Sequence, residues 1–595
     1  MRAVKHIHWI DILVLLLALT ITLLGIGNYG LYEPHEGHFA MVGQEMIWRN
    51  DWITPHLNGS PYLNKPPLLY WLIATSTYFL GSTEFSARLP LALTGWLGIA
   101  IAWKWTRELW GIDASRVCAL MLSVTLGWFI FTHQILIDVL LGTLLLCSNY
   151  FLWRLIYQSQ SPFNWWGTYL SLALCVLTKG LVGIVFPLLG CLALIVVRRD
   201  WKIVRRIKLY RGLLLVIAVV LPWFVAVERA NPGFWHYFIV NEHLDRIIDR
   251  RFPPDYEVSK TSALGYLAIT ACWCFPWILF LPSVVKSTWL EWRQGFITSS
   301  SLQNRKHSDG IFLLAVGAAL PVVLFLPLSS RLIYYSIPAI PPYVILCAGW
   351  WNKYHRTMNL YGAIALIFGF AFYGVVAVLP LIINLLPAIL NTPQIGRLIV
   401  IVAIALGTGW LASSIAMLRR SAKAWIPIFI SLIITYSGTV QGFIIYQDIR
   451  SVKNLVQQAN TCLSRDTLWT FEGSREIGAA GAIAYYLNQE VNNPQAEAQN
   501  NYRTVMVLSD GGKNRLPPQF PGSPPSYLIT KPQLQTYWDS DRPTVFLTDF
   551  MRQPSDPNDP ITLNLPQGAI EPYLVLGQRQ LYLNQAAREQ VRQCR

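Results

Sequence analysis

The stretch LYGAIALIFGFAFYGVVAVLPLIINLL, residues 360–386, contains no Asp, Glu, Lys, Arg or His. It is long enough to cross a bilayer as a single helix. Five further runs are almost as apolar, and they lie at 10–26, 181–197, 213–227, 311–328 and 399–417. A soluble fold of this length could not cover so much apolar surface. The sequence therefore predicts an integral membrane protein.

Composition supports this prediction. Of the 595 residues, 53% are hydrophobic and only 13% are charged, against about 25% charged residues in a typical soluble domain. The 25 Trp and 27 Tyr fit aromatic belts at the two membrane surfaces. The net charge of +15 does not indicate nucleic acid binding, because the basic segment RRDWKIVRRIKLYR, residues 198–211, lies between two apolar runs. It is typical of a cytoplasmic turn.

The positive-inside rule predicts the orientation. Arg2 and Lys5 place the N-terminus in the cytoplasm, so the first span delivers residues 28–65 to the outer side. The basic turns are then expected inside, and they lie at 104–116, 198–211, 286–307, 353–356 and 419–423. The short apolar piece 67–80 follows two prolines and is rich in aromatic residues. We expect it to lie along the outer interface.

The alternation of inner and outer loops predicts thirteen spans, and they lie at 10–27, 87–105, 115–132, 135–157, 165–178, 181–197, 209–227, 262–283, 310–328, 332–350, 360–388, 397–417 and 424–446. An odd count leaves residues 447–595 outside. The predicted fold class is mostly α: a polytopic membrane domain at 1–446, whose first outer loop at 28–86 carries interfacial helices, and an extracytoplasmic α/β domain at 447–595. The location is the plasma (inner) membrane.

The C-terminal part has a different pattern. Short β-like runs occur at 468–471, 505–508, 527–530, 545–548 and 573–576, and residues 479–487 are predicted to be helical. Seven of the nine Cys lie in or beside apolar segments, as small buried hydrophobes do. Cys462 and Cys594 lie in the polar part and could form a disulfide if that part is outside, but the sequence leaves this open. No nucleotide-binding glycine motif is present.

Candidate functional residues gather in the first outer loop, YEPHEGHFAMVGQEMIWRNDWITPHLNGSPYLNKPPLLYW, residues 32–71. Residues 36–49 have helical spacing. Glu33 and Glu36 could act as a general base or bind a divalent ion, and Lys65, framed by prolines, could hold a lipid phosphate. The alternative is a solvated amphipathic helix on the bilayer surface.

Asp138 lies in the otherwise apolar stretch HQILIDVLLGTLLL. An ionisable side chain there is costly and is a candidate functional residue, although an acid favoured by a helix N-terminus is the alternative. Lys179 and Arg331 fall at outer helix ends, against the positive-inside trend, which suggests an anionic partner such as a lipid phosphate. Snorkelling is the alternative for both. The charges of the outer loop 228–260 are expected to be mostly solvated.

The loop motifs resemble a known family. The strings DWITP, NG, PY and KPPLLYW within residues 51–71, followed by ARLP at 87–90, are similar to those of the aminoarabinose transferases, which belong with the protein O-mannosyltransferases in the C-type glycosyltransferase superfamily. Shorter matches follow in order: Asp138, Thr178-Lys179-Gly180, Pro222-Trp223, Glu242-His243, Pro276-Trp277, and Ser330-Arg331 with Tyr334, Tyr335 and Pro338. The likeness extends over about residues 8–350.

The resemblance implies transfer of a sugar from a polyprenyl-phosphate donor to a lipid, glycan or protein acceptor at the outer membrane face. His35 stands where the family has Asp, His38 where it has a basic residue, and Asn64 where it often has an acid.

We expect Glu36, with Glu33 and Asp138, to orient or deprotonate the acceptor. Lys65, Lys179 and Arg331 would bind the donor phosphate. The remaining candidates for substrate contact are Tyr62, Trp71, His35, His38 and Tyr335. A divalent metal ion is left open, with Glu36 and Asp138 as its candidate ligands.

The alternative function is a transporter or flippase of lipid-linked glycans. It would require charges at mid-membrane and repeated halves, and the sequence has neither.

Overall fold

The computed structural model describes residues 8–33, 35–248, 250, 261–297, 301–328, 331–354, 359–383, 393–472, 477–489, 503–508, 527–548, 565–569, 571–577 and 579–594. The chain divides into two compact units. Unit 1 comprises Met1–Leu24, Leu91–Pro222 and Tyr256–Gly442, and unit 2 comprises Gly25–Pro90, Trp223–Asp255 and Phe443–Arg595. Each unit is described by itself.

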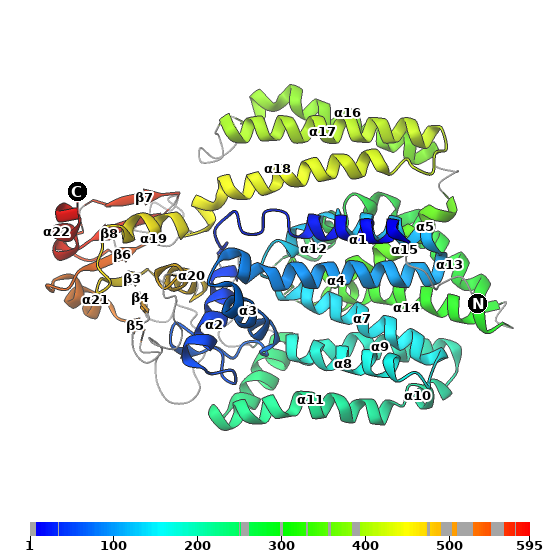
Figure 1. The fold of residues 1–595 in the computed structure, drawn as a ribbon, viewed down its shortest axis with the longest axis horizontal. Coiled ribbons are helices and arrows are strands. Elements are labelled where there is room, and N and C mark those ends of the chain that lie inside the picture. The colour runs from blue at the N-terminus through cyan, green and yellow to red at the C-terminus, as the bar shows by residue number, and fades with distance from the viewer. Residues whose placement is uncertain are drawn as a thin grey trace. The chain divides into compact units, whose positions relative to one another are not determined.

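Unit 1 is helical (Figure 1). Its elements, including α4, α11 and α18, which continue into unit 2, are α1 (Trp9–Thr22), α4 (Glu84–Trp110), α5 (Ile112–Ser123), α6 (Leu126–Thr132), α7 (Ile137–Tyr157), α8 (Pro162–Lys179), α9 (Val182–Arg198), α10 (Lys202–Arg206), α11 (Leu209–Ala230), α12 (Ala263–Trp273), η3 (Trp277–Phe280), α13 (Leu281–Ile297), α14 (Leu302–Phe325), η4 (Ile337–Ala339), α15 (Ile340–Tyr354), α16 (Asn359–Ile383), α17 (Pro393–Leu418) and α18 (Ile426–Arg450).

The helix lengths support a multi-pass membrane protein. Within the described residues, seven helices are long and apolar enough to cross a bilayer, and up to nine if the bent pairs α5–α6 and α12–α13 each count as one span. The expected spans at 10–27 and 181–197 correspond to α1 and α9, which are apolar but shorter. The coarse prediction of a polytopic, mostly helical fold is confirmed.

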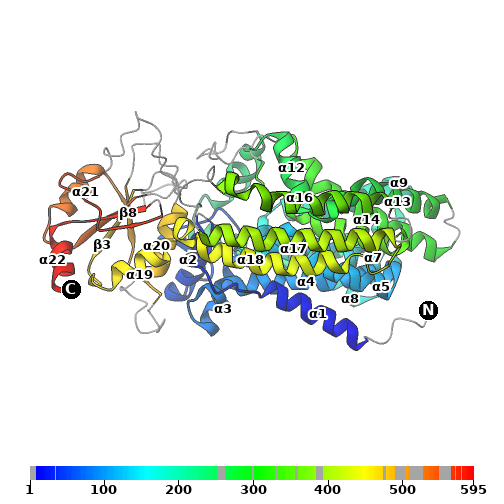
Figure 2. The same cartoon turned by 90° about the horizontal axis from the view of Figure 1, so that it is seen from above.

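Helix α7 forms the centre of unit 1. Most of its apolar window is buried, whereas α11 and α16 leave most of theirs exposed. Helix α7 packs on α8, α9 and α14, while α16 and α17 run side by side over their length (Figure 2). Exposed apolar side chains on the outer helices suit contact with lipid, because an apolar side chain that faces lipid tails carries no free-energy cost of exposure to water.

Unit 2 contains the first loop. Its helices are α2 (His35–Arg49), α3 (Leu68–Leu80) and the π-helix η1 (His236–Asp245), and a two-stranded ribbon joins β1 (His56–Leu57) to β2 (Ser60–Pro61). The helix predicted at 36–49 is confirmed as α2. Helix α3 has 13 residues, or about 20 Å at 1.5 Å per residue, which is too short to span a bilayer. That length agrees with the interfacial position expected for residues 67–80.

A six-stranded sheet completes unit 2, with strand order β5-β4-β3-β6-β8-β7. The strands are β3 (Leu468–Phe471), β4 (Val505–Leu508), β5 (Leu528–Ile529), β6 (Thr544–Leu547), β7 (Leu574–Leu576) and β8 (Arg579–Leu583). The first four of these pair in parallel and β8 pairs antiparallel with both β6 and β7.

Four helices accompany the sheet: α19 (Lys453–Asn460), α20 (Ile477–Leu487), α21 (Lys531–Trp538) and α22 (Gln585–Cys594). In Figure 2, α19 and α20 lie on one side of the strands and α21 and α22 on the other. All five β-like runs and the helix at 479–487 are confirmed as secondary structure. Cys462 and Cys594 form a disulfide, so the pairing that the sequence left open is present in the structure.

Candidate active site

Glu36 and Arg88 form a buried ion pair in unit 2. Arg88 Nε donates to Glu36 Oε1 at 2.8 Å and its NH2 group donates to Oε2 at 2.7 Å. Glu36 Oε2 also accepts the backbone N–H of Tyr32 at 2.7 Å. Both side chains are almost fully buried. The guanidinium therefore binds both oxygens of the Glu36 side chain and fixes its position.

Arg88 does more than neutralise Glu36. Its guanidinium donates to the carbonyl oxygens of Ile26, Tyr29 and Gly30 at 2.7–2.8 Å and lies 3.9 Å from the centre of the Tyr29 ring. These carbonyls belong to the chain that leads into α2. Arg88 thus fastens the start of the first loop, a role that the ARLP motif did not reveal from sequence.

Glu33 is paired in the same manner with a residue far along the chain. Its carboxylate contacts Arg579 on β8, and both side chains are buried. The backbone of Glu33 exchanges two hydrogen bonds with Arg450, each 2.8 Å long. The acid end of the first loop is therefore bound to the C-terminal part of unit 2 at two points.

Two histidines and Tyr62 lie next to these acids. The rings of His35 and His38 are 6.1 Å apart, and the rings of His38 and Tyr62 are 5.6 Å apart. Burial, together with the charge of Arg450, lowers the pKa of His35 to about 4. His35 is thus neutral at physiological pH and cannot replace the carboxylate of its relatives as an anion. Trp71, on α3, donates its indole N–H to the Trp52 carbonyl.

Lys65 belongs to a second buried cluster, centred on Glu242 of η1. Lys65 Nζ and Arg246 NH1 lie 3.8 and 3.7 Å from the same oxygen, Glu242 Oε2. Tyr237 O–H is 3.1 Å from Glu242 Oε1 and 2.5 Å from Asn64 Oδ1. Because Glu242 is buried, the expectation that the charges of the 228–260 loop are mostly solvated is wrong for this residue.

Two cations, Lys65 and Arg246, face the carboxylate of Glu242 in this cluster. Tyr237 has a single hydroxyl proton and can donate it to only one of its two oxygen neighbours at a time. The sequence indicated Lys65 but not these partners, because Tyr237 and Glu242 are more than 170 positions away in the chain.

Asp138 and Lys179 form the central polar contact of unit 1. Asp138 lies in the first turn of α7 and accepts a hydrogen bond of 2.6 Å from Lys179 Nζ through Oδ1. Lys179 Nζ also lies 4.4 Å from the centre of the Tyr335 ring. Asp138 Oδ2 is buried and accepts no hydrogen bond from the described residues. An oxygen of this kind is costly unless a ligand or water donates to it.

Arg331 lies in the same neighbourhood of unit 1, because Tyr266 has Asp138, Tyr335 and Arg331 all as electrostatic neighbours. Its Nε donates to the Leu328 carbonyl at 2.8 Å and its NH1 donates to the Thr261 carbonyl at 3.1 Å. No carboxylate pairs with Arg331 in the part of the chain that the structure describes.

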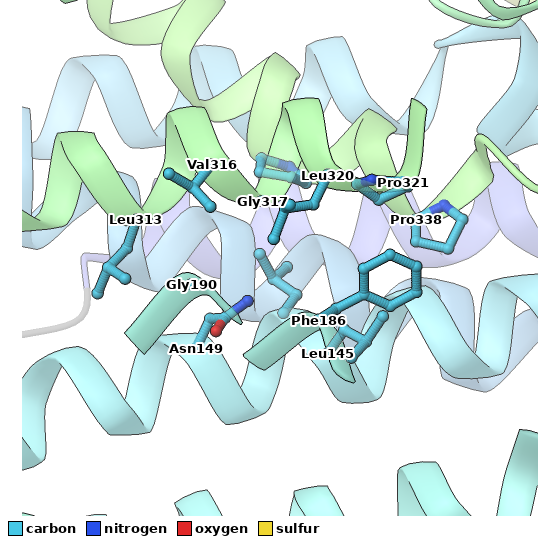
Figure 3. A pocket seen from close by; sticks show the side chains of 12 residues that line it. Leu145, Asn149, Phe186, Gly190, Leu313, Val316, Gly317, Leu320, Pro321 and Pro338 are labelled. Atoms are coloured by element: carbon cyan, nitrogen blue, oxygen red, sulfur yellow. The ribbon is translucent and has the colours of Figure 1, made fainter. Parts of the chain in front are cut away.

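An apolar pocket lies further along α7 (Figure 3). The lining residues come from five elements of unit 1: Leu145, Leu146 and Asn149 of α7, Phe186 and Gly190 of α9, Leu313, Val316, Gly317, Leu320 and Pro321 of α14, Pro338 of η4, and Pro342 of α15. Asn149 provides its one side-chain amide. The pocket begins about two turns of α7 beyond Asp138.

The described residues do not make up a metal-binding set. Glu36 and Asp138, the two candidate ligands, belong to different units, and a cation pairs with each of them. Three or more His, Cys, Asp or Glu side chains do not come together anywhere among the described residues. No step is therefore assigned to a metal ion.

Comparisons with known proteins support the resemblance to sugar transferases. A family model described as dolichyl-phosphate-mannose-protein mannosyltransferase matches residues 64–225. The chain is 26% identical over 499 residues, 80% of its length and 83% of the relative's, to the undecaprenyl phosphate-alpha-4-amino-4-deoxy-L-arabinose arabinosyl transferase of Pectobacterium carotovorum. The enzyme of the same description from Enterobacter is 28% identical over 60% of this chain and 63% of its own.

The fold matches a solved structure over nearly its whole length. ArnT from Cupriavidus metallidurans, in the apo state, has a TM-score of 0.73 and 19% identity, covering 97% of this chain and 98% of that one.

The protein is a membrane glycosyltransferase. Within that class it is similar to the aminoarabinose transferases and to the protein mannosyltransferases. The relatives named above are transferases, which supports glycosyl transfer over the transporter alternative.

Proposed function

We propose that this protein transfers a sugar from a polyprenyl-phosphate donor to a hydroxyl or phosphate group of a lipid, glycan or protein acceptor at the outer face of the membrane. The names of the relatives, which use an undecaprenyl-phosphate-linked amino sugar, support the donor class. The single observation that carries the proposal is the Lys65 cluster. Lys65 and Arg246 meet there on one acceptor, Glu242 Oε2, and the same two cations suit the phosphate of such a donor.

Within unit 2 we assign Lys65 to the donor phosphate, with Arg246 beside it. Binding an anion there would compete with Glu242 for Lys65, and it would stabilise the negative charge that develops on the leaving phosphate. Tyr62, Trp71, His35 and His38 are proposed to line the sugar or lipid. Glu33 and Glu36 are proposed to position the loop that presents these side chains, because Arg579 and Arg88 hold their carboxylates.

Within unit 1 we assign Asp138 to the acceptor. Its Oδ2 would accept the proton of the attacking hydroxyl. The acceptor oxygen then forms a bond to the anomeric carbon, the bond from that carbon to the phosphate oxygen breaks, and the lipid phosphate leaves with the electron pair. Lys179 and Arg331 are proposed to bind phosphate groups, and Tyr335 holds Lys179 in place through its ring face.

The finer topology is also a proposal. Thirteen spans, a cytoplasmic N-terminus and an exported α/β domain at 447–595 beside a membrane domain at 1–446 agree with the charge distribution of the loops. Cysteine accessibility labelling at residues placed in the 198–211 turn and in α22 tests it. Labelling of both positions from the same side would contradict it.

We propose that the transfer does not depend on a divalent ion, and this has its own test. Activity that survives chelation unchanged is expected, because Arg88 and Lys179 already neutralise the two candidate carboxylates. Activity that is lost in chelator and restored by Zn²⁺ or Mn²⁺ would contradict this expectation.

The function is tested with the purified protein in nanodiscs. A panel of undecaprenyl-phosphate sugars, radiolabelled in the sugar, is offered with lipid A, with a lipid mixture lacking lipid A, or with envelope glycoproteins. The proposal predicts label in one acceptor fraction and release of an equal amount of undecaprenyl phosphate. Movement of intact donor across the vesicle membrane without release would support the transporter instead.

A further inference from the structure

The turn between α9 and α11, residues 198–211, carries seven cations and one carboxylate. The cations are Arg198, Arg199, Lys202, Arg205, Arg206, Lys208 and Arg211, and the carboxylate is Asp200. The turn contains the short helix α10 and joins two apolar helices of unit 1. Nothing in the proposed transfer reaction uses these residues.

One side of this turn is fixed to the rest of unit 1. Ile203 and Ile207 are buried, and the Ile207 carbonyl accepts the hydroxyl of Tyr169 at 2.9 Å. Arg198 pairs with the buried Asp309 of α14. Arg206 and Arg305 both pair with Asp200. The single carboxylate of the turn is thus already shared between two arginines.

The other side of the turn has cations without carboxylate partners. Arg199, Lys202, Arg205 and Arg211 are exposed. Among the residues that the structure describes, no ion pair joins any of them to an Asp or Glu. We call these four residues, with Trp201 and Tyr210, the basic face. Trp201 and Tyr210 are each 66% exposed.

The surface next to the basic face is apolar. Leu192 and Val196, in the last two turns of α9, are exposed, as are Leu214 and Ile217 near the start of α11. These side chains are typical of contact with lipid tails. On each side of the turn, exposed apolar side chains are followed within about two helical turns by an exposed cation and an exposed aromatic ring: Val196, Arg199 and Trp201 on one side, and Leu214, Arg211 and Tyr210 on the other. Aromatic rings and cations together at the end of an apolar helix surface are typical of the membrane interface.

We infer that the basic face binds the headgroups of anionic phospholipids in the leaflet that surrounds α9 and α11. The cations supply charge complementarity, and the two aromatic rings supply anchors at headgroup depth. An acidic protein partner would also satisfy the charge. It would leave the exposed rings and the adjoining apolar side chains unexplained, since those are continuous with the lipid-facing surface.

The test measures lipid preference in the full-length protein. Wild-type protein and the variant Lys202→Gln/Arg205→Gln/Arg211→Gln are purified from mixed phosphatidylglycerol and phosphatidylcholine nanodiscs, and retained lipids are counted by native mass spectrometry. The matched control is Arg419→Gln/Arg420→Gln/Lys423→Gln. It removes the same charge from another exposed basic turn of unit 1, and no exposed Trp or Tyr lies within that turn.

The inference predicts that the variant loses at least about tenfold in preference for phosphatidylglycerol over phosphatidylcholine, and that high salt weakens the wild-type preference. The control should keep most of that preference, and both variants should elute as monodisperse protein. Unchanged preference in the basic-face variant would overturn the inference, as would an equal loss in the control, because net charge alone would then explain the binding.

Discussion

Arg88 is the residue on which the first loop depends most. Five of its hydrogen bonds reach Glu36 and the carbonyls of residues 26–30, and its ring contact reaches Tyr29. A buried ion pair of this kind contributes little net stability when it is compared with an apolar pair of equal size, but breaking it leaves one charge buried without compensation.

We therefore predict that removing one charge of this pair destabilises the protein more than replacing both residues by apolar ones. Glu36→Gln should lower the free energy of unfolding by about 3–5 kcal/mol and reduce transfer through loss of folded protein. The double variant Glu36→Leu/Arg88→Met should recover part of that stability. Thermal unfolding in detergent measures both. A Glu36→Gln protein that is fully stable yet inactive would assign Glu36 to the chemistry rather than to positioning.

The histidines of the first loop predict a pH dependence of stability. Burial lowers the pKa of both His35 and His56 to about 4, against 6.5 for a free imidazole. Above about pH 6.5 both are neutral in the folded and the unfolded chain. As the pH falls towards 4, only the unfolded chain takes up protons, so stability is lost by at most about 1.4 kcal/mol per pH unit for each histidine. Below pH 4 this loss stops.

Melting temperatures measured from pH 8 to pH 4 check this. His35→Gln/His56→Gln should flatten the curve between pH 6.5 and 4, and replacement of the exposed His236 serves as the control. A curve that is equally steep in the double variant would contradict the assignment.

At this scale the sequence indicated which residues to examine but not their partners. Lys65 and Asp138 stand out because a cation framed by prolines and an acid in an apolar run are unusual in themselves. The burial of Glu242 could not be predicted, since its neighbours Asn241 and His243 are polar and its partner Lys65 is 177 positions away. The pairing of Glu33 with Arg579 spans 546 positions.

At the scale of elements, the closest packing in unit 2 joins α2 to α20. A Cβ on Gly37 would overlap the Cβ of Ala482, and a Cβ on Gly481 would lie 3.0 Å from the Cα of His38. Glycine at both positions allows the two helices to approach closely. Helix α2, which carries His35, Glu36 and His38, is thereby held against the C-terminal part of the same unit.

Gly37→Ala should separate these helices and lower stability by about 1–3 kcal/mol. The control is Gly374→Ala in α16, where a Cβ meets no atom within 4 Å and where alanine should stabilise the helix by about 0.5–1 kcal/mol. Thermal unfolding of both variants checks the pair. A Gly37→Ala protein as stable as wild type would show that the two helices do not pack this closely.

Secondary structure followed from sequence wherever local pattern decides it. Long apolar runs became helices, and short β-branched or aromatic runs became the strands β3 to β7. Strand β8 escaped prediction because it begins with Arg579 and Gln580. Arg579 is buried and contacts Glu33, and no pattern within the strand indicates such a contact. Hydropathy likewise does not predict the bends between α5 and α6 and between α12 and α13.

For the molecule as a whole, the Cys462–Cys594 disulfide indicates the cellular compartment of the C-terminal part. It joins residues 132 positions apart, and a cross-link of that length stabilises by up to about 5 kcal/mol in the chain-entropy model. Disulfides persist in oxidising compartments, so the bond supports the proposed export of residues 447–595.

Thiol counting tests this. Denatured protein from membranes should show seven reactive thiols without reduction and nine after it, since the chain has nine Cys and seven are free. Cys594→Ser should lower the melting temperature, and Cys272→Ser should not. Nine reactive thiols before reduction would place the C-terminal part in a reducing compartment.

The central claim is that the protein moves a sugar off a lipid phosphate, and one measurement tests it most directly. Release of undecaprenyl phosphate from a labelled undecaprenyl-phosphate sugar is followed in nanodiscs for wild type, for Lys65→Ala and for the control Lys423→Ala. The account predicts release by wild type and control, and at least about a hundredfold loss of kcat/KM in Lys65→Ala with its melting temperature retained. Equal release by all three proteins, or release by none, would contradict it.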